Sequence, residues 1–232
     1  MKVGARLETI AQFVPVGKSI VDVGTDHAYV PALLAKQGLI TFAIASDIVS
    51  GPCEAAQATV DTYGLQNLIK VRQGSGLTIV VPNEVDVIVI AGMGGVTMIK
   101  ILAESLPVAK SATRLVLQPM NGAAPLRAWC INQGWKIVDE TLVEEASKLY
   151  VIIVLELGEQ APLEATVAEV GPLLLANKHH LLGKHIQKLI RHYNKLLNSM
   201  LHSEAARESA KYQEFALRKQ ELEAIARDYD CC

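Results

Sequence analysis

The residues best suited to chemistry lie in one short turn. After Val23 the chain reads Gly-Thr-Asp-His-Ala-Tyr at 24–29, so a predicted buried strand ends in a glycine turn with two carboxylates and an imidazole nearby. A pyrophosphate-binding loop needs further glycines here, so that backbone can approach the phosphates. Asp26 and His27 occupy those places instead. Asp22, Asp26 and an acid expected on the next strand would make the mouth of the predicted pocket acidic. An acidic mouth repels pyrophosphate and suits a cation, which favours the sulfonium cofactor S-adenosylmethionine (SAM) over NAD.

Three later segments extend this predicted cofactor site. Asp47, followed by Ile48, closes the second predicted strand, where an acid can accept hydrogen bonds from ribose hydroxyls; alone it would only form a turn. The Gly-Ser-Gly at 74–76 can let an adenine ring lie against backbone, although a plain loop explains it equally well. The Ala-Gly-Met-Gly-Gly at 91–95 follows a strand, where open α/β folds bind ligands, or is a flexible turn. The expected cofactor contacts are Asp22, Gly24, Thr25, Asp26, His27, Asp47, Ile48, Gly74, Ser75, Gly76, Ala91, Gly92 and Met93.

A further group of residues indicates the substrate. Leu-Gln-Pro-Met-Asn at 117–121 places two amides around a rigid proline, and amides can pair with the edge of a base. Tyr29 could supply a ring on which that base stacks. Taken singly, a capping Asn121 and a core Tyr29 are equally good interpretations, but together these residues suggest a nucleobase substrate.

In the first part of the chain, short apolar runs alternate with helical patterns. The predicted strands span residues 19–23, 41–46, 69–73, 85–90 and 115–118. Most of them are nearly continuous in Val, Ile, Leu or Ala, as strands buried on both faces must be. This alternation predicts βαβ units and a parallel sheet. Residues 135–142 and 150–157 are separated by a segment too short for a crossover helix, so they predict an antiparallel hairpin. A parallel sheet with a terminal antiparallel hairpin is typical of the Rossmann-like, class I SAM-dependent methyltransferases, an α/β fold.

The C-terminal third has a different pattern. Glycines and prolines from Gly158 onward predict a boundary between a SAM-binding domain, 1–157, and a helical domain, 158–232. Apolar residues recur there at alternating steps of four and three, at Leu182, Ile186, Leu189, Tyr193, Leu196 and Met200. A second helical stretch, 205–229, predicts that the two helices form a coiled-coil-like antiparallel hairpin.

The first of these helices is strongly basic. No acidic residue occurs between Glu169 and Glu204, whereas this stretch contains Lys178, Lys184, Lys188, Arg191 and Lys195, together with His179, His180, His185, His192 and His202. Zinc ligands need convergent geometry, and His ligands are usually accompanied by Cys or carboxylate ligands, so no metal is expected. A solvated face paired with acids on the second helix stays open as an interpretation. Contact with a polyanion is favoured, because it needs a row of cations rather than one particular spacing.

Composition narrows the location of the protein. No uninterrupted apolar run reaches the ~18 residues that a membrane-spanning helix needs, so no membrane contact is expected. The first residues carry the charges of Lys2, Arg6 and Glu8 without an apolar signal core, which predicts a cytoplasmic protein. The cysteines have no metal-ligand spacing and are interpreted as reduced thiols, at Cys53, Cys130, Cys231 and Cys232.

Taken together, the motifs at 22–31, 91–95, 117–119 and 148–150 closely resemble the bacterial tRNA (adenine-N1)-methyltransferases that modify adenine at tRNA position 22. The resemblance covers nearly the whole chain and includes the C-terminal helices, which that family uses with its catalytic domain to hold tRNA. Arg6-Leu7 also looks like the family's N-terminal pattern, so Arg6 is a candidate contact with cofactor or tRNA. Ser75 departs from the family, where an acid is usual. Met120 departs as well, since an Asn directly after Gln-Pro is common.

The resemblance implies SAM-dependent methylation of N1 of that adenine, with tRNA as partner and the protein as a monomer or weak dimer. Positions in the motifs give candidate catalytic roles to Asp26, His27, Tyr29, Gln118 and Asn121. The predicted RNA contacts are Arg6, from the resemblance, and the cations of the basic helix, Lys178, Lys184, Lys188, Arg191 and Lys195. Two alternatives stay open. One is a methyltransferase for a protein or small molecule, with a hairpin that only dimerises; the other is a non-catalytic nucleic-acid-binding protein of the same fold.

Overall fold

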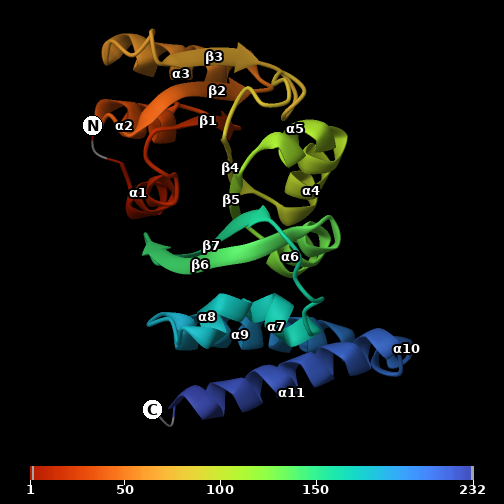
Figure 1. Cartoon of the computed structure of the whole chain (residues 1–232). Coiled ribbons are helices and arrows are strands. Elements are labelled where there is room, and N and C mark those ends of the chain that lie inside the picture. The colour runs from red at the N-terminus through yellow and green to blue at the C-terminus, as the bar shows by residue number, and fades with distance from the viewer. Residues whose placement is uncertain (2, 231–232) are drawn as a thin grey trace. The chain divides into compact units, whose positions relative to one another are not determined.

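The computed structural model describes residue 1 and residues 3–230 (Figure 1). Our interpretation of Cys231 and Cys232 therefore concerns residues outside the described ones. The chain divides into two compact units, Met1–Pro162 and Leu163–Cys232. From the sequence we expected the division after residue 157. Among the described residues, no helix is long and apolar enough to cross a membrane.

The first unit is built on a seven-stranded sheet with the order β3-β2-β1-β4-β5-β7-β6. Its strands are β1 Lys18–Val23, β2 Ile40–Asp47, β3 Ile69–Gln73, β4 Val87–Met93, β5 Arg114–Pro119, β6 Trp135–Glu145 and β7 Lys148–Leu157. The first five are parallel, and β7 runs antiparallel to both β5 and β6. The predicted Rossmann-like sheet with a terminal hairpin is therefore confirmed. Several boundaries differ from the prediction, most clearly at two strand ends: β4 continues past Ile90, because Ala91 and Met93 still pair with β5, and β6 continues past Leu142 to Glu145.

Helices cover both faces of this sheet (Figure 1). One face carries α1 Ala5–Gln12, α2 Tyr29–Lys36 and α3 Ser50–Thr62, and the other carries α4 Gly95–Glu104, α5 Leu106–Ser111 and α6 Ala123–Asn132. The residues from Val87 to Ile90 are fully buried, as a central strand covered on both faces requires.

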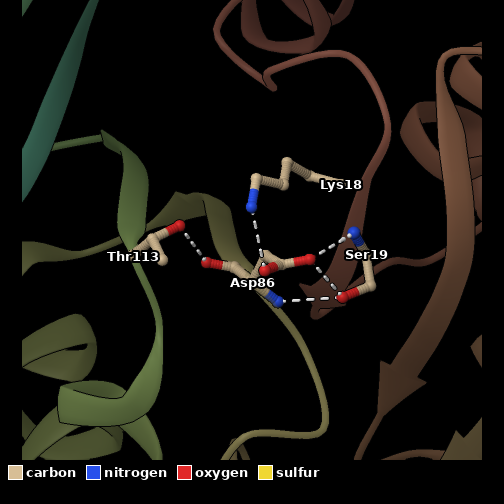
Figure 2. Close-up of polar contacts among 4 residues, drawn as sticks. All are labelled: Lys18, Ser19, Asp86 and Thr113. Atoms are coloured by element: carbon tan, nitrogen blue, oxygen red, sulfur yellow. Dashed lines mark hydrogen bonds and ion pairs between the residues drawn. The ribbon is translucent and has the colours of Figure 1, made fainter.

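Asp86 fastens three strands at the amino edge of the sheet (Figure 2). Its carboxylate accepts hydrogen bonds from the Ser19 backbone N–H at 2.9 Å and the Ser19 hydroxyl at 2.8 Å, and it contacts Lys18 Nζ at 3.2 Å. Its carbonyl accepts a hydrogen bond from the Thr113 hydroxyl at 3.0 Å. The bonds from Ser19 hold the pKa of Asp86 below its usual range. The starts of β1, β4 and β5 are thus joined by polar contacts, at the edge opposite to the predicted site.

The second unit contains helices and no strand among its described residues. They are α7 Ala165–Val170, α8 Pro172–Ala176, α9 Leu182–Met200, α10 Glu204–Arg207 and α11 Ala210–Asp230. Helices α9 and α11 pack together, and the Tyr193 and Phe215 rings meet edge to face at 5.7 Å. The Tyr229 hydroxyl donates to the Leu175 carbonyl at 2.6 Å, which ties the end of α11 to α8. The predicted second helix is interrupted between α10 and α11.

The buried stripe of α9 differs in part from the predicted one. Leu182, Ile186 and Tyr193 are buried as expected. Ile190 is buried in place of the predicted Leu189, and Leu197 in place of the predicted Leu196. A straight helix drifts away from a strict seven-residue repeat, which explains the shift. His185, which we counted with the basic residues of this stretch, does not lie on the exposed face of the helix. It is buried, and its Nε2 lies 3.1 Å from the Val170 carbonyl oxygen.

Candidate active site

The glycine turn after β1 has the unusual backbone that its sequence suggests. Gly24, Asp26 and Ala28 adopt positive φ values of +71°, +51° and +54°. A Cβ on Gly24 would also collide with the end of the Met93 side chain. Glycine adopts this left-handed conformation without steric cost, and at Gly24 it also leaves the end of the Met93 side chain in place.

Two cavities meet at this turn. The first, which we call the Asp47 cavity, has a volume of about 250 Å³. The predicted cofactor contacts that line it are Gly24, Asp47, Ile48, Gly74, Ser75, Gly76 and Met93. One face of α4 completes the wall with Thr97, Lys100, Ile101 and Glu104, which we did not predict. Their helical spacing directly after the glycine block was the signal available in the sequence.

The second cavity, which we call the Asp22 cavity, has a volume of about 390 Å³. It is lined by Arg6, Leu7, Asp22, Gly24, Thr25, Asp26, His27, Tyr29, Val30, Ala91 and Gly92. Gly24 belongs to both linings. The two cavities together contain every predicted cofactor contact.

Asp22 is the buried carboxyl group of this site. The Thr25 hydroxyl donates to its Oδ2 at 2.5 Å. Burial raises the pKa of Asp22 to about 6, although the Thr25 hydrogen bond and the Arg6 cation oppose the rise. Asp47 adds a smaller effect in the raising direction. Near neutral pH the site therefore holds an incompletely compensated negative charge, which a cationic ligand would stabilise.

Asp26, His27 and Tyr29 form a partly exposed group in the Asp22 cavity. The His27 Nε2 lies 3.5 Å from Asp26 Oδ2, and the His27 and Tyr29 rings stack at 5.0 Å with an angle of 17° between their planes. The Asp26 side chain is 69% exposed. A carboxylate and two stacked rings are thus available to a ligand that enters from solvent.

Gln118 is fully buried, and both ends of its amide are occupied. Its Oε1 accepts a hydrogen bond from Arg6 Nη1 at 2.8 Å, and its Nε2 donates to Met120 Sδ at 3.7 Å. The Arg6 guanidinium also lies 5.4 Å from the centre of the Tyr150 ring, which makes a cation–π contact. Tyr150 entered our prediction only as part of a motif, because its partner lies near the opposite end of this unit's sequence.

Asn121 lines neither of these two cavities. Its backbone carbonyl accepts a hydrogen bond from Gly95 N–H at 2.9 Å, and a Cβ on Gly94 would lie 3.1 Å from its Oδ1. A Cβ on Gly95 would collide with the Gly122 carbonyl oxygen. The structure therefore places Asn121 where it supports the tight start of α4.

The five predicted RNA-binding cations of the second unit are all exposed. Lys184, Lys188, Arg191 and Lys195 recur along α9 at steps of four, three and four, so they share one helix face. Lys178 precedes that helix. We call these five residues the basic row. Over residues 1 and 3–230, no group of three or more His, Cys, Asp or Glu side chains could hold a metal ion.

Comparison with known proteins decides the family. A family profile described as a methyltransferase domain matches residues 3–153. A protein of Bacillus subtilis (strain 168) named tRNA (adenine(22)-N(1))-methyltransferase is 34% identical over 198 residues, which cover 83% of each chain. The chain belongs to the tRNA (adenine(22)-N1)-methyltransferase family. It is accordingly a SAM-dependent methyltransferase.

Solved structures agree with this membership of the tRNA (adenine(22)-N1)-methyltransferase family. The crystal structure of the B. subtilis m1A22 tRNA methyltransferase TrmK matches with a TM-score of 0.88 at 31% identity, over 97% of this chain and 99% of that one. Streptococcus pneumoniae Sp1610 in complex with S-adenosyl-L-methionine matches with a TM-score of 0.87 at 34% identity, over 97% and 100% of the two chains. SAM is thus the cofactor of this protein, and the acidic, glycine-lined walls of the two cavities fit it.

Proposed function

We propose that the protein methylates N1 of adenine 22 in tRNA, and that the two cavities divide the reactants between them. The observation that carries this assignment is their meeting at Gly24, at the carboxyl edge of the sheet. The Asp47 cavity takes the adenosyl part of the cofactor. The Asp22 cavity takes its cationic end together with the target base.

The walls of the Asp47 cavity suit an adenosine group. Asp47 stands at the end of β2, where its carboxylate can accept hydrogen bonds from ribose hydroxyls. The turn at 74–76 offers backbone to the adenine ring, and Ser75 leaves it without the acid usual in the family. On the other side of Gly24, the buried Asp22 stabilises the positive charge of the cofactor.

The residues of the Asp22 cavity suit a nucleobase that becomes charged. SAM supplies an electrophilic methyl group, and N1 of adenine has a lone pair that needs no prior deprotonation. Alignment is therefore the main requirement, and correct orientation can lower a barrier by roughly 7–11 kcal/mol. Asp26 stabilises the positive charge that develops on the methylated ring. His27 orients Asp26 through their contact at 3.5 Å.

The base must first leave its stack or pair, because N1 lies on its Watson–Crick edge. Such a step costs a few kcal/mol. The Tyr29 ring, stacked on His27, offers a face that replaces the lost stacking. Gln118 holds the wall behind this base through its contacts with Arg6 and Met120.

The basic row holds the tRNA backbone, because exposed cations on one helix face can neutralise a series of phosphates. We place this reaction in the cytoplasm, with the protein acting as a monomer or weak dimer. The row then determines affinity, while the base is selected in the Asp22 cavity.

The test uses purified protein and SAM with two transcripts of one tRNA, which carry adenine or guanine at position 22. Nucleoside mass spectrometry is expected to find 1-methyladenosine only in the adenine transcript. Methylation of both transcripts would place the modified base elsewhere. Measurable SAM binding without product from either transcript would contradict the proposed substrate.

A further inference from the structure

The N-terminal helix α1 receives its cap from a distant part of the chain. Gly4 is its N-cap residue and has no side chain with which to bond the free N–H groups of the first turn. Glu145, at the end of β6, supplies the acceptor instead: its Oε1 accepts a hydrogen bond from the Arg6 backbone N–H at 3.1 Å. A carboxylate is favourable at this end of a helix, because the helix dipole is positive there.

Gly4 provides the space that this contact needs. A Cβ on Gly4 would lie 2.7 Å from Glu145 Cδ and closer still to Oε1. The backbone of Gly4 has φ −75° and ψ 160°, an extended conformation that any residue can adopt. The role of glycine here is therefore steric, and an alanine would displace the Glu145 carboxylate without straining the backbone.

Glu145 bonds to the backbone of Arg6, and the side chain of the same Arg6 reaches Gln118. Arg6 has only donors, so the oxygen of the Gln118 amide must face it and the nitrogen is left facing Met120. The position of α1 thus fixes both the wall of the Asp22 cavity and the orientation of a fully buried amide behind it.

We propose that Glu145 is a positioning residue for methyl transfer: it fixes the start of α1, so that Arg6 keeps its place in the wall of the cavity that receives the base and its contact with the buried Gln118. This inference rests on the proposed assignment of the Asp22 cavity to adenine. The hairpin between β6 and β7 then serves the reaction as well as the sheet.

The experiment compares Glu145→Ala, Gly4→Ala and Glu145→Gln in the full-length protein. Steady-state methylation of the adenine-22 transcript gives kcat and KM, calorimetry gives the SAM Kd, and thermal unfolding verifies folding. We expect Glu145→Ala and Gly4→Ala to lower kcat about tenfold or more with little change in SAM Kd, since a misplacement of about 1 Å can cost 10²-fold. Glu145→Gln keeps an acceptor for the Arg6 N–H and is expected to restore most of the turnover.

Two controls separate positioning from general stability of α1. Glu8→Ala removes an exposed acid from the first turn of the helix without touching the Glu145 contact, and it should leave kcat unchanged. In a protein that already carries Arg6→Ala, Glu145→Ala should cost little more, because both changes release the same amide.

Full turnover in both Glu145→Ala and Gly4→Ala would overturn the inference. So would a double variant Arg6→Ala/Glu145→Ala whose loss of kcat equals the product of the two single losses. If Gly4→Ala does not fold, the comparison of Glu145→Ala with Glu145→Gln decides. Failure of the wild-type protein to methylate the adenine-22 transcript would instead contradict the proposed function.

Discussion

Asp22 is a buried carboxyl group within the sheet, and it also supplies negative charge to the candidate site. Its carboxylate accepts a hydrogen bond from the Thr25 hydroxyl at 2.5 Å. Desolvation raises its pKa from 3.8 to about 6. A group that is costly to ionise in the ligand-free protein becomes favourable to ionise beside a cation, so Asp22 couples protonation to cofactor binding.

This coupling predicts a pH-dependent stability difference. Between pH 3.8 and about 6 the folded protein binds more protons at Asp22 than the unfolded chain does, so the free energy of unfolding falls as pH rises across that range. Asp22→Asn keeps an acceptor for Thr25 and does not titrate. We expect the unfolding free energy of the variant, relative to that of the wild type, to increase from about pH 4 to pH 6. Above about pH 6 this increase should stay constant at about 1–3 kcal/mol. Urea unfolding at several pH values measures this difference, and parallel curves would contradict it.

Asp26 has the opposite environment, because it is exposed and contacts His27. Its proposed role is confined to the transition state. Asp26→Asn is therefore expected to lower kcat roughly 10–100-fold and to leave the SAM Kd within about twofold. This loss is smaller than the roughly 10²–10³-fold loss seen when a stabiliser in a water-excluded site is removed, because Asp26 is exposed. Single-turnover methylation and calorimetry test this pair of outcomes. Undiminished turnover with intact SAM binding would refute the role.

The sequence located most residues of the site because they follow strands in short, glycine-rich turns. It missed the contacts made by Arg6, since Gln118, Tyr150 and Glu145 all lie more than a hundred residues away. Such pairs depend on the order of strands in the sheet, which no local pattern contains. His185 shows the same limit, because its burial depends on a helix elsewhere in the unit.

At the scale of elements, the two edges of the sheet differ in how they are built. The carboxyl edge carries turns in which glycines alternate with polar side chains, and the glycines leave room for ligands. The amino edge is fastened by Asp86, which joins β1, β4 and β5. Apolar runs identified every strand, but they could not reveal this polar fastening or the extension of β4 to Met93.

Asp86→Asn is expected to lower the free energy of unfolding by about 1–2 kcal/mol, because a neutral amide replaces the charged acceptor of the Ser19 bonds. Activity per folded molecule should not change, since the site lies at the other edge. The lowered pKa of Asp86 means that its contribution is present above about pH 4 and is lost as the pH falls through the folded-state pKa. Chemical unfolding at pH 7 and at pH 3 measures both effects. Lys18→Ala, which removes only an exposed ion pair, should cost less than about 1 kcal/mol, and a larger loss than in Asp86→Asn would contradict the assignment.

At the scale of the whole molecule, the cavities proposed for methyl transfer and the basic row proposed for tRNA binding belong to different units. Met1–Pro162 contains both cavities, and Leu163–Cys232 contains the basic row. The sequence indicated this separation through the absence of acids between Glu169 and Glu204. It could not show which cations share a face until the start and phase of α9 were known.

Replacing Lys184, Lys188, Arg191 and Lys195 by Gln is expected to weaken tRNA binding and to leave SAM binding unchanged. Each lost phosphate contact should reduce the slope of log K against log salt by about 1. Filter binding between about 50 and 200 mM salt measures that slope. Lys211→Gln with Lys219→Gln on α11 serves as the control, because Lys211 lies over the Phe215 ring and Lys219 pairs with Glu223. An unchanged slope in the fourfold variant would show that the row does not contact tRNA.

The presence of Gly24 in the walls of both cavities has a consequence for inhibitor design. If the cavities hold the reactants as proposed, both occupants lie against Gly24, so a short linker should join an adenosine group to a second nucleobase. Binding of one half then becomes an intramolecular step for the other, at an effective concentration set by the linker. A bisubstrate compound of this kind would exceed the affinity of either half without making any new contact with the protein.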